Sequence, residues 1–188
     1  MKNNAVFLDS EEKLLEHLGS TLGGIFSPGE SVAVKLHMGE PGNRHYIKSD
    51  FTKRIIGILR NIGCEPFLFD TPVVYMSPRG SVKGYQKSAA KHGYSEEELG
   101  VPVIISDRSF SAGGVYMDYG VASEPVEAGG VLLLTHFKGH VASGMGGAIK
   151  NIGMGCMSKE TKGKIHSGGE PVYVSGCTEC GTCVENCP

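Results

Sequence analysis

Short apolar runs rich in β-branched residues recur along the chain between longer amphipathic segments. They cover residues 32–37 (VAVKLH), 66–70 (PFLFD), 101–107 (VPVIISD) and 131–137 (VLLLTHF). Their apolar positions are continuous rather than alternating, which is typical of strands that are covered on both faces. We therefore expect these runs to be the buried strands of a mostly parallel sheet.

The segments between these runs carry apolar residues at helical spacing. Residues 49–61 form such a pattern and end just before Gly63, and residues 81–92 end before Gly93. An earlier helix is expected after Ser10, whose hydroxyl can cap its first turn. Alternation of strands and helices predicts an α/β fold with a mostly parallel sheet and helices on both faces.

The compositional shift near Ser158 marks the expected end of this body. It predicts an α/β ligand-binding domain over residues 1–170 and the start of a ferredoxin-type segment over residues 171–188. Glycine, with 28 residues, is about twice as frequent as usual. The glycines are clustered, which indicates loops whose backbone adopts positive φ angles or lies very close to another group. Clustering of this kind does not indicate disorder.

Charge and hydropathy exclude several classes of partner. The 18 Lys and Arg residues are dispersed and the net charge is −2, so nucleic acid is not expected. The first 19 residues lack the apolar run of a signal peptide, and no apolar stretch approaches bilayer length. These features predict a cytoplasmic protein without a membrane partner, in which thiols stay reduced and favour metal ligation over disulfides. No particular redox partner, small-molecule ligand or oligomeric state is predicted.

Four cysteines lie close together at the end of the sequence. Their spacing, Cys177-x₂-Cys180-x₂-Cys183-x₃-Cys187 followed by Pro188, is that of a bacterial ferredoxin run. Two intervening residues let successive thiolates reach neighbouring corners of one cubane, so we expect a [4Fe–4S] cluster. A zinc site is the alternative, although its second cysteine pair usually comes from further along the chain. A disulfide framework fits least well with a reducing compartment.

The identity of the fourth cluster ligand is left open. In two-cluster ferredoxins the last cysteine of such a run binds the other cluster, and no second run follows here. Either Cys187 or Cys156 could complete the site, and a truncated chain need not hold a cluster by itself. We expect the natural protein to continue beyond this sequence. Cys64 is interpreted as a small buried apolar residue, and Cys156 could be either apolar filler or a ligand.

Polar residues follow nearly every predicted strand. Ligands of open α/β sheets bind beyond the carboxyl ends of the strands, so these residues are expected to converge on one rim. A divalent metal could be held there by the imidazoles and one carboxylate; the candidate ligands are His37, Glu40, His136 and His140. Asp70 and Asp107 also follow strands, but both could be turn residues that bind nearby backbone amides. His37 could equally be a packed histidine with an ordinary hydrogen bond.

The segment GMGGAIKNIGMG, residues 144–155, follows the last predicted strand. Its glycines permit close backbone approach, and GAIKN could open a helix whose free amides face an anion. The expected ligand-binding residues are Lys138, Gly146, Gly147, Lys150 and Asn151. A tight connection packed against the sheet is the alternative interpretation.

Several of these motifs occur together, and in the same order, in one known family. KLHMGEPGNRHYIKSDFTKRII, FLFDTPVVYMSPRGSVKGYQKSAAKHGY, GVPVIISD and HFKGHVASGMGGAIKNIGMGCMSKETKGKIH resemble the iron–sulfur centre proteins classed as domain of unknown function 362. The resemblance implies an α/β domain followed by ferredoxin-type cluster motifs, commonly two. It implies no particular reaction.

A second resemblance concerns only the glycine-rich segment. It is similar in form to a segment of the nickel-pincer lactate racemases, in which histidines and a lysine hold a nickel-bearing nucleotide cofactor. The matching residues are His140, Gly144, Gly146, Gly147 and Lys150. Other parts of the racemase pattern are not present, so this resemblance implies a shared ligand-binding loop rather than shared catalysis.

Together these features predict an iron–sulfur protein with a redox or electron-transfer role. In this interpretation a [4Fe–4S] cluster is coupled to an α/β domain that binds a small ligand or metal at its strand ends. The alternative is a non-redox metal-dependent enzyme, or a module that binds small anions and carries a structural cluster. No nucleophile elbow, zincin motif or dinucleotide fingerprint is present in the sequence, so no catalytic residue is predicted.

Overall fold

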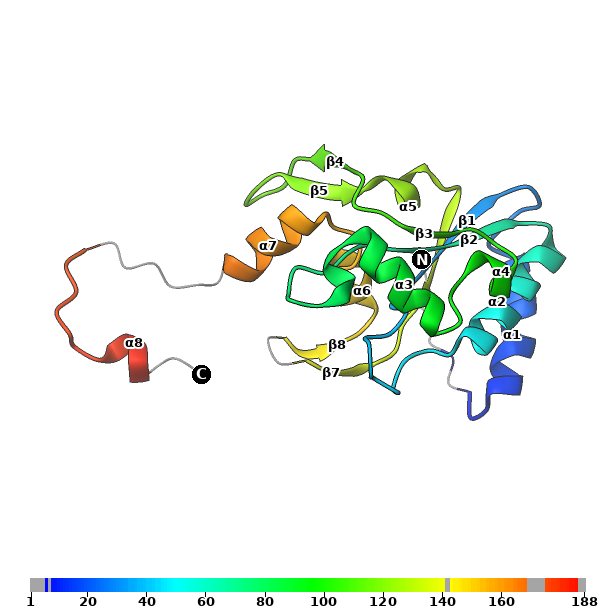
Figure 1. Cartoon of the computed structure of the whole chain (residues 1–188), viewed down its shortest axis with the longest axis horizontal. Helices are drawn as coiled ribbons and strands as arrows, with labels where there is room; N and C mark the ends of the chain where they lie inside the picture. The colour runs from blue at the N-terminus through cyan, green and yellow to red at the C-terminus, as the bar shows by residue number, and fades with distance from the viewer. Residues whose placement is uncertain (1–5, 7, 141–142, 169–174, 186–188) are drawn as a thin grey trace.

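A four-stranded parallel sheet lies at the centre of the computed structural model, which describes residues 6, 8–140, 143–168 and 175–185 (Figure 1). The strands are β1 (Ser31–Leu36), β2 (Glu65–Asp70), β3 (Val103–Ile105) and β6 (Gly130–Leu134), in the spatial order β3-β2-β1-β6. β1 is therefore flanked by β2 on one side and by β6 on the other, and all three pairings are parallel. The predicted α/β class and parallel sheet are confirmed.

One face of the sheet is covered by the helices from the first half of the chain. They are α1 (Glu11–Gly23), α2 (Ser49–Ile62), α3 (Val82–Lys91) and α4 (Glu96–Leu99). The side chains of Ser10, Ser81 and Ser95 accept hydrogen bonds from the first turns of α1, α3 and α4. α2 ends at Gly63, whose φ of 96° is left-handed.

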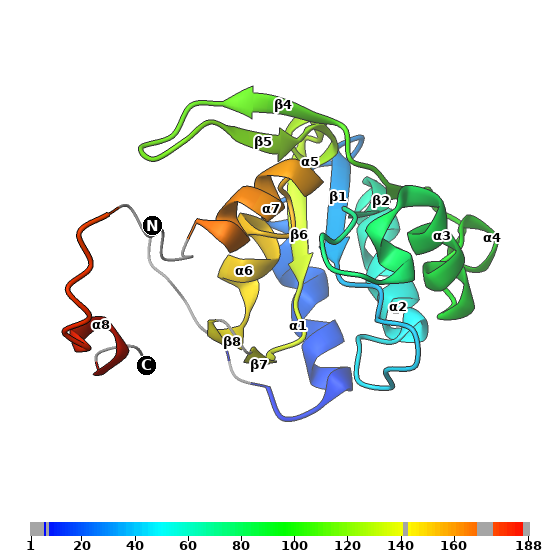
Figure 2. The same ribbon diagram turned by 60° about the vertical axis from the view of Figure 1, so that its left-hand side comes forward.

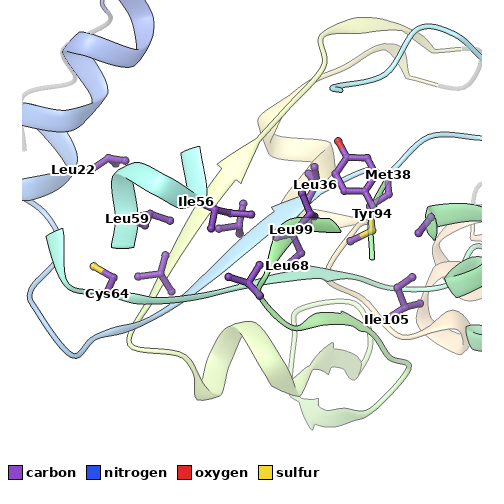
Figure 3. Packing of buried hydrophobic residues seen from close by; sticks show 14 of the residues in the cluster. Leu22, Leu36, Met38, Ile56, Leu59, Cys64, Leu68, Tyr94, Leu99 and Ile105 are labelled. Atoms are coloured by element: carbon purple, nitrogen blue, oxygen red, sulfur yellow. The ribbon is translucent and has the colours of Figure 1, made fainter. Parts of the chain in front are cut away.

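The main core lies between these helices and the sheet (Figure 3). Leu36 and Leu68 of the strands pack with Ile56 and Leu59 of α2, and all four side chains are buried. Leu22 of α1 belongs to the same cluster. Full burial of such a side chain contributes about 1.5–3 kcal/mol, so this face supplies much of the hydrophobic stabilisation.

The opposite face is covered by segments from the second half of the chain (Figure 2). The elements of this half are β4 (Ser109–Ala112), β5 (Tyr119–Ala122), α5 (Ser123–Glu127), β7 (Lys138–His140), β8 (Gly144–Gly146), α6 (Ala148–Gly153) and α7 (Lys159–Ser167). Phe69 of β2 packs here against Ala122 and Cys156. The prediction that helices lie on both faces is thus confirmed.

Two of the predicted strands are too long. The third spans Val103–Ile105 rather than residues 101–107, and the fourth ends at Leu134 rather than at Phe137. The last pair between β1 and β6 is Leu36 with Leu134, so the backbone beyond Leu134 has no strand beside it in that register. The antiparallel pairs β4–β5 and β7–β8 were not predicted, because their sequences lack regular apolar alternation.

Two short elements complete the chain. A 3₁₀ turn, Pro78–Gly80, precedes α3, and a four-residue helix α8, Thr182–Glu185, lies in the cysteine segment. Among the described residues, no helix combines the length and apolar character needed to cross a bilayer.

Candidate functional site

A cavity of about 250 Å³ opens at the carboxyl ends of β1, β2 and β6. Its wall includes Lys35 of β1, Asp70 of β2 and Leu134 of β6. From β1 the chain builds β2 and β3 on one side and returns to place β6 on the other. The cavity therefore lies where the strand order reverses, which is the usual ligand site of open α/β sheets.

The deepest part of the cavity holds a buried ion pair. Lys35 Nζ lies 2.8 Å from Asp70 Oδ1, and the two residues are 1% and 4% exposed. Lys35 also donates to Asn151 Oδ1 of α6 at 2.9 Å. Arg79 Nη2 lies 3.5 Å from the second Asp70 oxygen, which also accepts a hydrogen bond from the Tyr85 hydroxyl. Burial alone would raise the pKa of Asp70, but Lys35, Arg79 and the other nearby cations lower it to about 2.

Arg79 joins this pair to the residues that follow β1. Its Nη1 lies 2.7 Å from His37 Nε2 and 2.5 Å from Glu40 Oε1. Burial, reinforced by the charge of Arg79, lowers the pKa of His37 to about 4, so this imidazole is neutral near pH 7. The Nε of Arg79 is buried and has no hydrogen-bond partner among the described residues.

Lys162 enters the cavity from α7 on the second face of the sheet. Its ammonium donates to Thr71 Oγ1 and, at 2.6 Å, to the carbonyl oxygen of Pro72. Thr71 in turn donates to the carbonyl oxygen of Gly155 at 2.7 Å. Burial lowers the pKa of Lys162 to about 8, although Asp70 opposes the shift. Lys162 is therefore protonated in most molecules at pH 7 and is a proton donor or acceptor near pH 8.

Close packing around this group depends on Gly155. A Cβ atom at this position would lie 2.1 Å from the Asn151 carbonyl oxygen and 2.7 Å from Lys35 Nζ. Both distances are shorter than van der Waals contact, so the turn after α6 can approach Lys35 only because residue 155 lacks a side chain.

The outer rim of the cavity is formed by the β7–β8 hairpin and α6. Lys138 and His140 lie on β7, and Lys150 on α6, with Lys150 Nζ 2.6 Å from His140 Nε2. His136 and His166 line the same wall. The pKa of Lys150 is lowered by partial burial and then by Lys138, and that of His140 by burial and then by Lys150. Basic groups thus crowd one another at this rim.

The structure brings most of the predicted strand-end residues to this cavity. His37, His136 and His140 line it, and Glu40 lies beside it on Arg79. The predicted ligand-binding residues are also in its wall; these are Lys138, Gly146, Gly147, Lys150 and Asn151. In the described parts of the chain, however, no group of three or more His, Cys, Asp or Glu side chains could hold a metal ion. His37, Glu40 and His140 are instead next to Arg79 or Lys150.

The two aspartates that follow strands differ in their surroundings. Asp70 is the buried partner of Lys35, so it is more than a turn residue. Asp107 is exposed, does not line the cavity, and accepts a hydrogen bond from the Lys159 amide at 2.7 Å. The turn-residue alternative therefore describes Asp107 well and Asp70 poorly.

Sequence reasoning missed the four buried polar side chains that surround Asp70 in the site. Lys35, Thr71, Arg79 and Lys162 were not candidates, although all four are buried in its wall. Only Lys35 left a clear signal, because a single cation inside the apolar run VAVKL must find a buried partner. Thr71, Arg79 and Lys162 reach the cavity through the fold rather than through a local pattern.

The cysteine segment can be described in part. Cys177 and Cys180 are exposed, and the Glu179 amide donates to Cys177 Sγ at 3.4 Å. Glu179, which lies between these two cysteines, has a φ of 55°. Gly176 and Gly181, which flank Cys177 and Cys180 in the sequence, are also left-handed, so the backbone changes direction sharply around the two cysteines. Hydrogen bonds from the Thr182 hydroxyl and backbone lower the pKa of Cys180 to about 7. The side chain of Cys183 and the whole of Cys187 lie outside the described residues.

This local structure suits a cluster-binding turn. An amide donor to sulfur and a partly ionised thiol at neutral pH are both favourable for iron–thiolate bonds. Cys156, the other possible fourth ligand, is 4% exposed and packs beside Phe69 and Ala122. Cys64 is likewise buried in the main core, where its thiol donates to the Ser27 carbonyl oxygen at 3.6 Å. Its interpretation as a buried apolar residue agrees with this position.

Residues 32–180 match the model of the family described as domain of unknown function (DUF362). No curated protein and no solved structure matches the chain.

Proposed function

This chain belongs to the DUF362 family, which is defined without an assigned activity, and we propose that it is an iron–sulfur protein whose α/β domain binds a small anion. The observation that carries the anion-binding role is the charge of the strand-end cavity. Among the described residues, its wall contains five lysine and arginine side chains and one carboxylate; these are Lys35, Arg79, Lys138, Lys150 and Lys162, against Asp70.

This excess of positive charge is costly without a ligand. Lys35, Arg79 and Lys162 are each at most 5% exposed, so water does not fully compensate their charges. Within the described part of the chain, the ion pairs of Asp70 and Glu40 supply two negative charges for these five cations. An anion in the cavity would relieve the remaining repulsion and could also reach the buried Nε of Arg79, which lacks a partner among the described residues.

The redox part of the proposal is supported by the cysteine run. Cys177, Cys180, Cys183 and Cys187 would hold a [4Fe–4S] cluster, and the left-handed residues around Cys177 and Cys180 and the amide donor to Cys177 Sγ are compatible with this role. When bound, a cluster of this type accepts and releases single electrons. The domain's own residues then have a different task, which is to hold an anionic ligand at the strand ends.

A ligand screen on the purified chain tests the anion-binding role. Small carboxylates and phosphates should raise the melting temperature, because a ligand that binds only the folded state stabilises it by RT ln(1 + [L]/Kd). Sodium chloride at matched ionic strength controls for general screening, and small amines control for charge sign. If no anion stabilises the chain beyond chloride, or if amines do so instead, the proposed role is wrong.

A further inference from the structure

Resting on the proposed anion site, we infer that Lys162 condenses with the carbonyl group of a small anionic ligand and forms a Schiff base. The ligand class is then a small acid that carries an aldehyde or ketone group, such as an α-keto acid. Lys162 acts in this role as a nucleophile rather than only as a positive charge.

The surroundings of Lys162 differ from those of Lys35, a second buried lysine in the wall of the cavity. Lys35 is held in its charged form by the ion pair with Asp70 at 2.8 Å. Among the described residues, Lys162 forms no ion pair with a carboxylate, and its nitrogen is bonded to the neutral oxygens of Thr71 and Pro72. These acceptors do not require a positive charge, so Lys162 can exist as a neutral amine.

The two acceptors leave the lone pair of the neutral amine available. Thr71 donates its own hydroxyl hydrogen to the Gly155 carbonyl oxygen at 2.7 Å, so the Thr71 oxygen accepts from Lys162. The Pro72 carbonyl oxygen accepts a second hydrogen at 2.6 Å. Both hydrogens of a neutral amine are thereby used, and the lone pair remains for an electrophile in the cavity that Lys162 lines.

Burial and neighbouring charges also favour the neutral amine. Lys162 is 5% exposed, and burial lowers its pKa to about 8. The charges of Lys35 and Arg79 add to the shift, whereas those of Asp70 and Asp107 oppose it. Because an ordinary lysine has a pKa of about 10.4, the fraction of neutral amine at pH 7 is raised on the order of a hundredfold. Buried lysines with a lowered pKa are the ones that form Schiff bases in proteins.

The condensation needs no oxidant or reductant. The nitrogen lone pair forms a C–N bond with the carbonyl carbon, and the two amine hydrogens leave with the carbonyl oxygen as one molecule of water. Protonation of the resulting imine gives an iminium cation, so a positive charge is kept beside the anionic group of the ligand. Val73, Val74 and Met154, apolar residues of the same wall, limit the access of water that would hydrolyse the imine.

Trapping with sodium borohydride tests this step. The purified chain is incubated with α-ketobutyrate at about pH 8 and reduced, and the labelled lysine is identified by peptide mass spectrometry. Reduction turns the imine into a stable secondary amine, so Lys162 should gain the mass of the ligand less one oxygen atom. Its labelling should exceed that of Lys164, an exposed lysine of the same helix, by about tenfold or more. The rate should rise with pH up to about 8, where the amine becomes the major form of Lys162.

Matched ligands and variants isolate the two parts of the inference. α-Hydroxybutyrate has the carboxylate but no carbonyl group, and butanone has the carbonyl group but no charge. Lys162→Arg and Lys162→Met should each remove the label from the intact chain. Lys87→Arg, at an exposed position of α3 away from the cavity, is the control and should leave labelling unchanged. The position of the label in the wild-type chain decides the assignment even if a Lys162 variant does not fold.

The outcomes distinguish the Schiff base from the proposed anion binding. Labelling of Lys162 by α-ketobutyrate, with little labelling by butanone, is the expected result. If both acids raise the melting temperature but no label is found on Lys162, the Schiff base is overturned while anion binding stands. If butanone labels Lys162 as fast as α-ketobutyrate does, the nucleophile is supported and the anionic ligand is overturned. If neither acid stabilises the chain and no label forms, both proposals fail.

Discussion

The ammonium group of Lys35 lies 2.8 Å from the carboxylate of Asp70, and both residues are almost completely buried. They come from adjacent parallel strands, and the contact lies directly beneath the proposed anion site. A buried pair of this kind is weak evidence for extra stability, but removing one member leaves the other charge without compensation. We therefore interpret the pair as a fixed polar group that positions two neighbouring side chains: Lys35 holds Asn151, and Asp70 holds Arg79.

A double-mutant cycle measures this coupling. Lys35→Met and Asp70→Asn should each lower the free energy of unfolding by about 3–5 kcal/mol, because each takes from a buried charge its nearest counter-charge. The double variant should lose less than the sum of the two. The exposed pair Lys13–Asp9, also 2.8 Å apart, is the matched control, and Lys13→Met should cost no more than about 1 kcal/mol. Equal losses in Lys35→Met and Lys13→Met, measured by urea unfolding, would contradict this interpretation.

The neutral state of His37 predicts a pH dependence of stability. Its pKa is lowered from 6.5 to about 4 in the folded chain, chiefly by burial and then by Arg79, with Lys138 adding to the shift and Asp70 and Glu40 opposing it. Below pH 6.5 the unfolded chain binds a proton that folded His37 rejects, so the stabilisation present above pH 6.5 is lost progressively down to about pH 4.

Urea unfolding between pH 7.5 and 4 checks this dependence. His37→Gln should flatten the curve between about pH 6.5 and 4, because its side chain does not titrate. His17→Gln, an exposed position on α1, is the control and should leave the curve unchanged. A His37→Gln curve that runs parallel to the wild type would show that His37 is not the group responsible.

Gly155 should be intolerant of even the smallest side chain. In Gly155→Ala the new Cβ would overlap the Asn151 carbonyl oxygen and crowd Lys35 Nζ, so the turn must shift. We expect a loss of about 1–3 kcal/mol in the free energy of unfolding, together with weaker anion binding. Gly153→Ala is the control, since a Cβ at the end of α6 meets no atom within 4 Å. Equal stability of both variants in thermal unfolding would contradict the steric argument.

The sequence predicted those features that depend on local patterns. The continuous apolar runs 32–37 and 66–70 located the central strands, the cap at Ser10 located the start of α1, and Gly63 located the end of α2. Ligands bind at the carboxyl ends of parallel strands, and this rule predicted that His37, His136 and His140 would lie at one rim of the sheet. The structure places all three in the wall of the same cavity.

The remaining features depend on contacts between distant residues. Arg79 lies on a short turn in SPRG with no periodic signal, yet it contacts His37 and Glu40, 42 and 39 positions away. Lys162 contacts Thr71 across 91 positions. Three of the predicted metal ligands, His37, His136 and His140, line the cavity. Nothing in their sequence pattern indicated that Arg79 and Lys162 lie in the same wall, and it is these cations that led us to propose an anion site rather than a metal site.

The cysteine segment gives the last prediction. Anaerobic reconstitution of the chain with iron and sulfide should produce a broad visible absorption that dithionite bleaches reversibly, as expected of an electron-transfer [4Fe–4S] cluster. Cys177→Ser and Cys180→Ser should each reduce the bound iron strongly, because each removes a thiolate from the turn. Cys64→Ser, which changes a buried thiol of the main core, is the control and should retain the wild-type iron content if it remains folded. Stoichiometric uptake of zinc with no uptake of iron would contradict the redox proposal and favour a structural zinc site, because a tetrahedral thiolate site has no electron to exchange when zinc fills it.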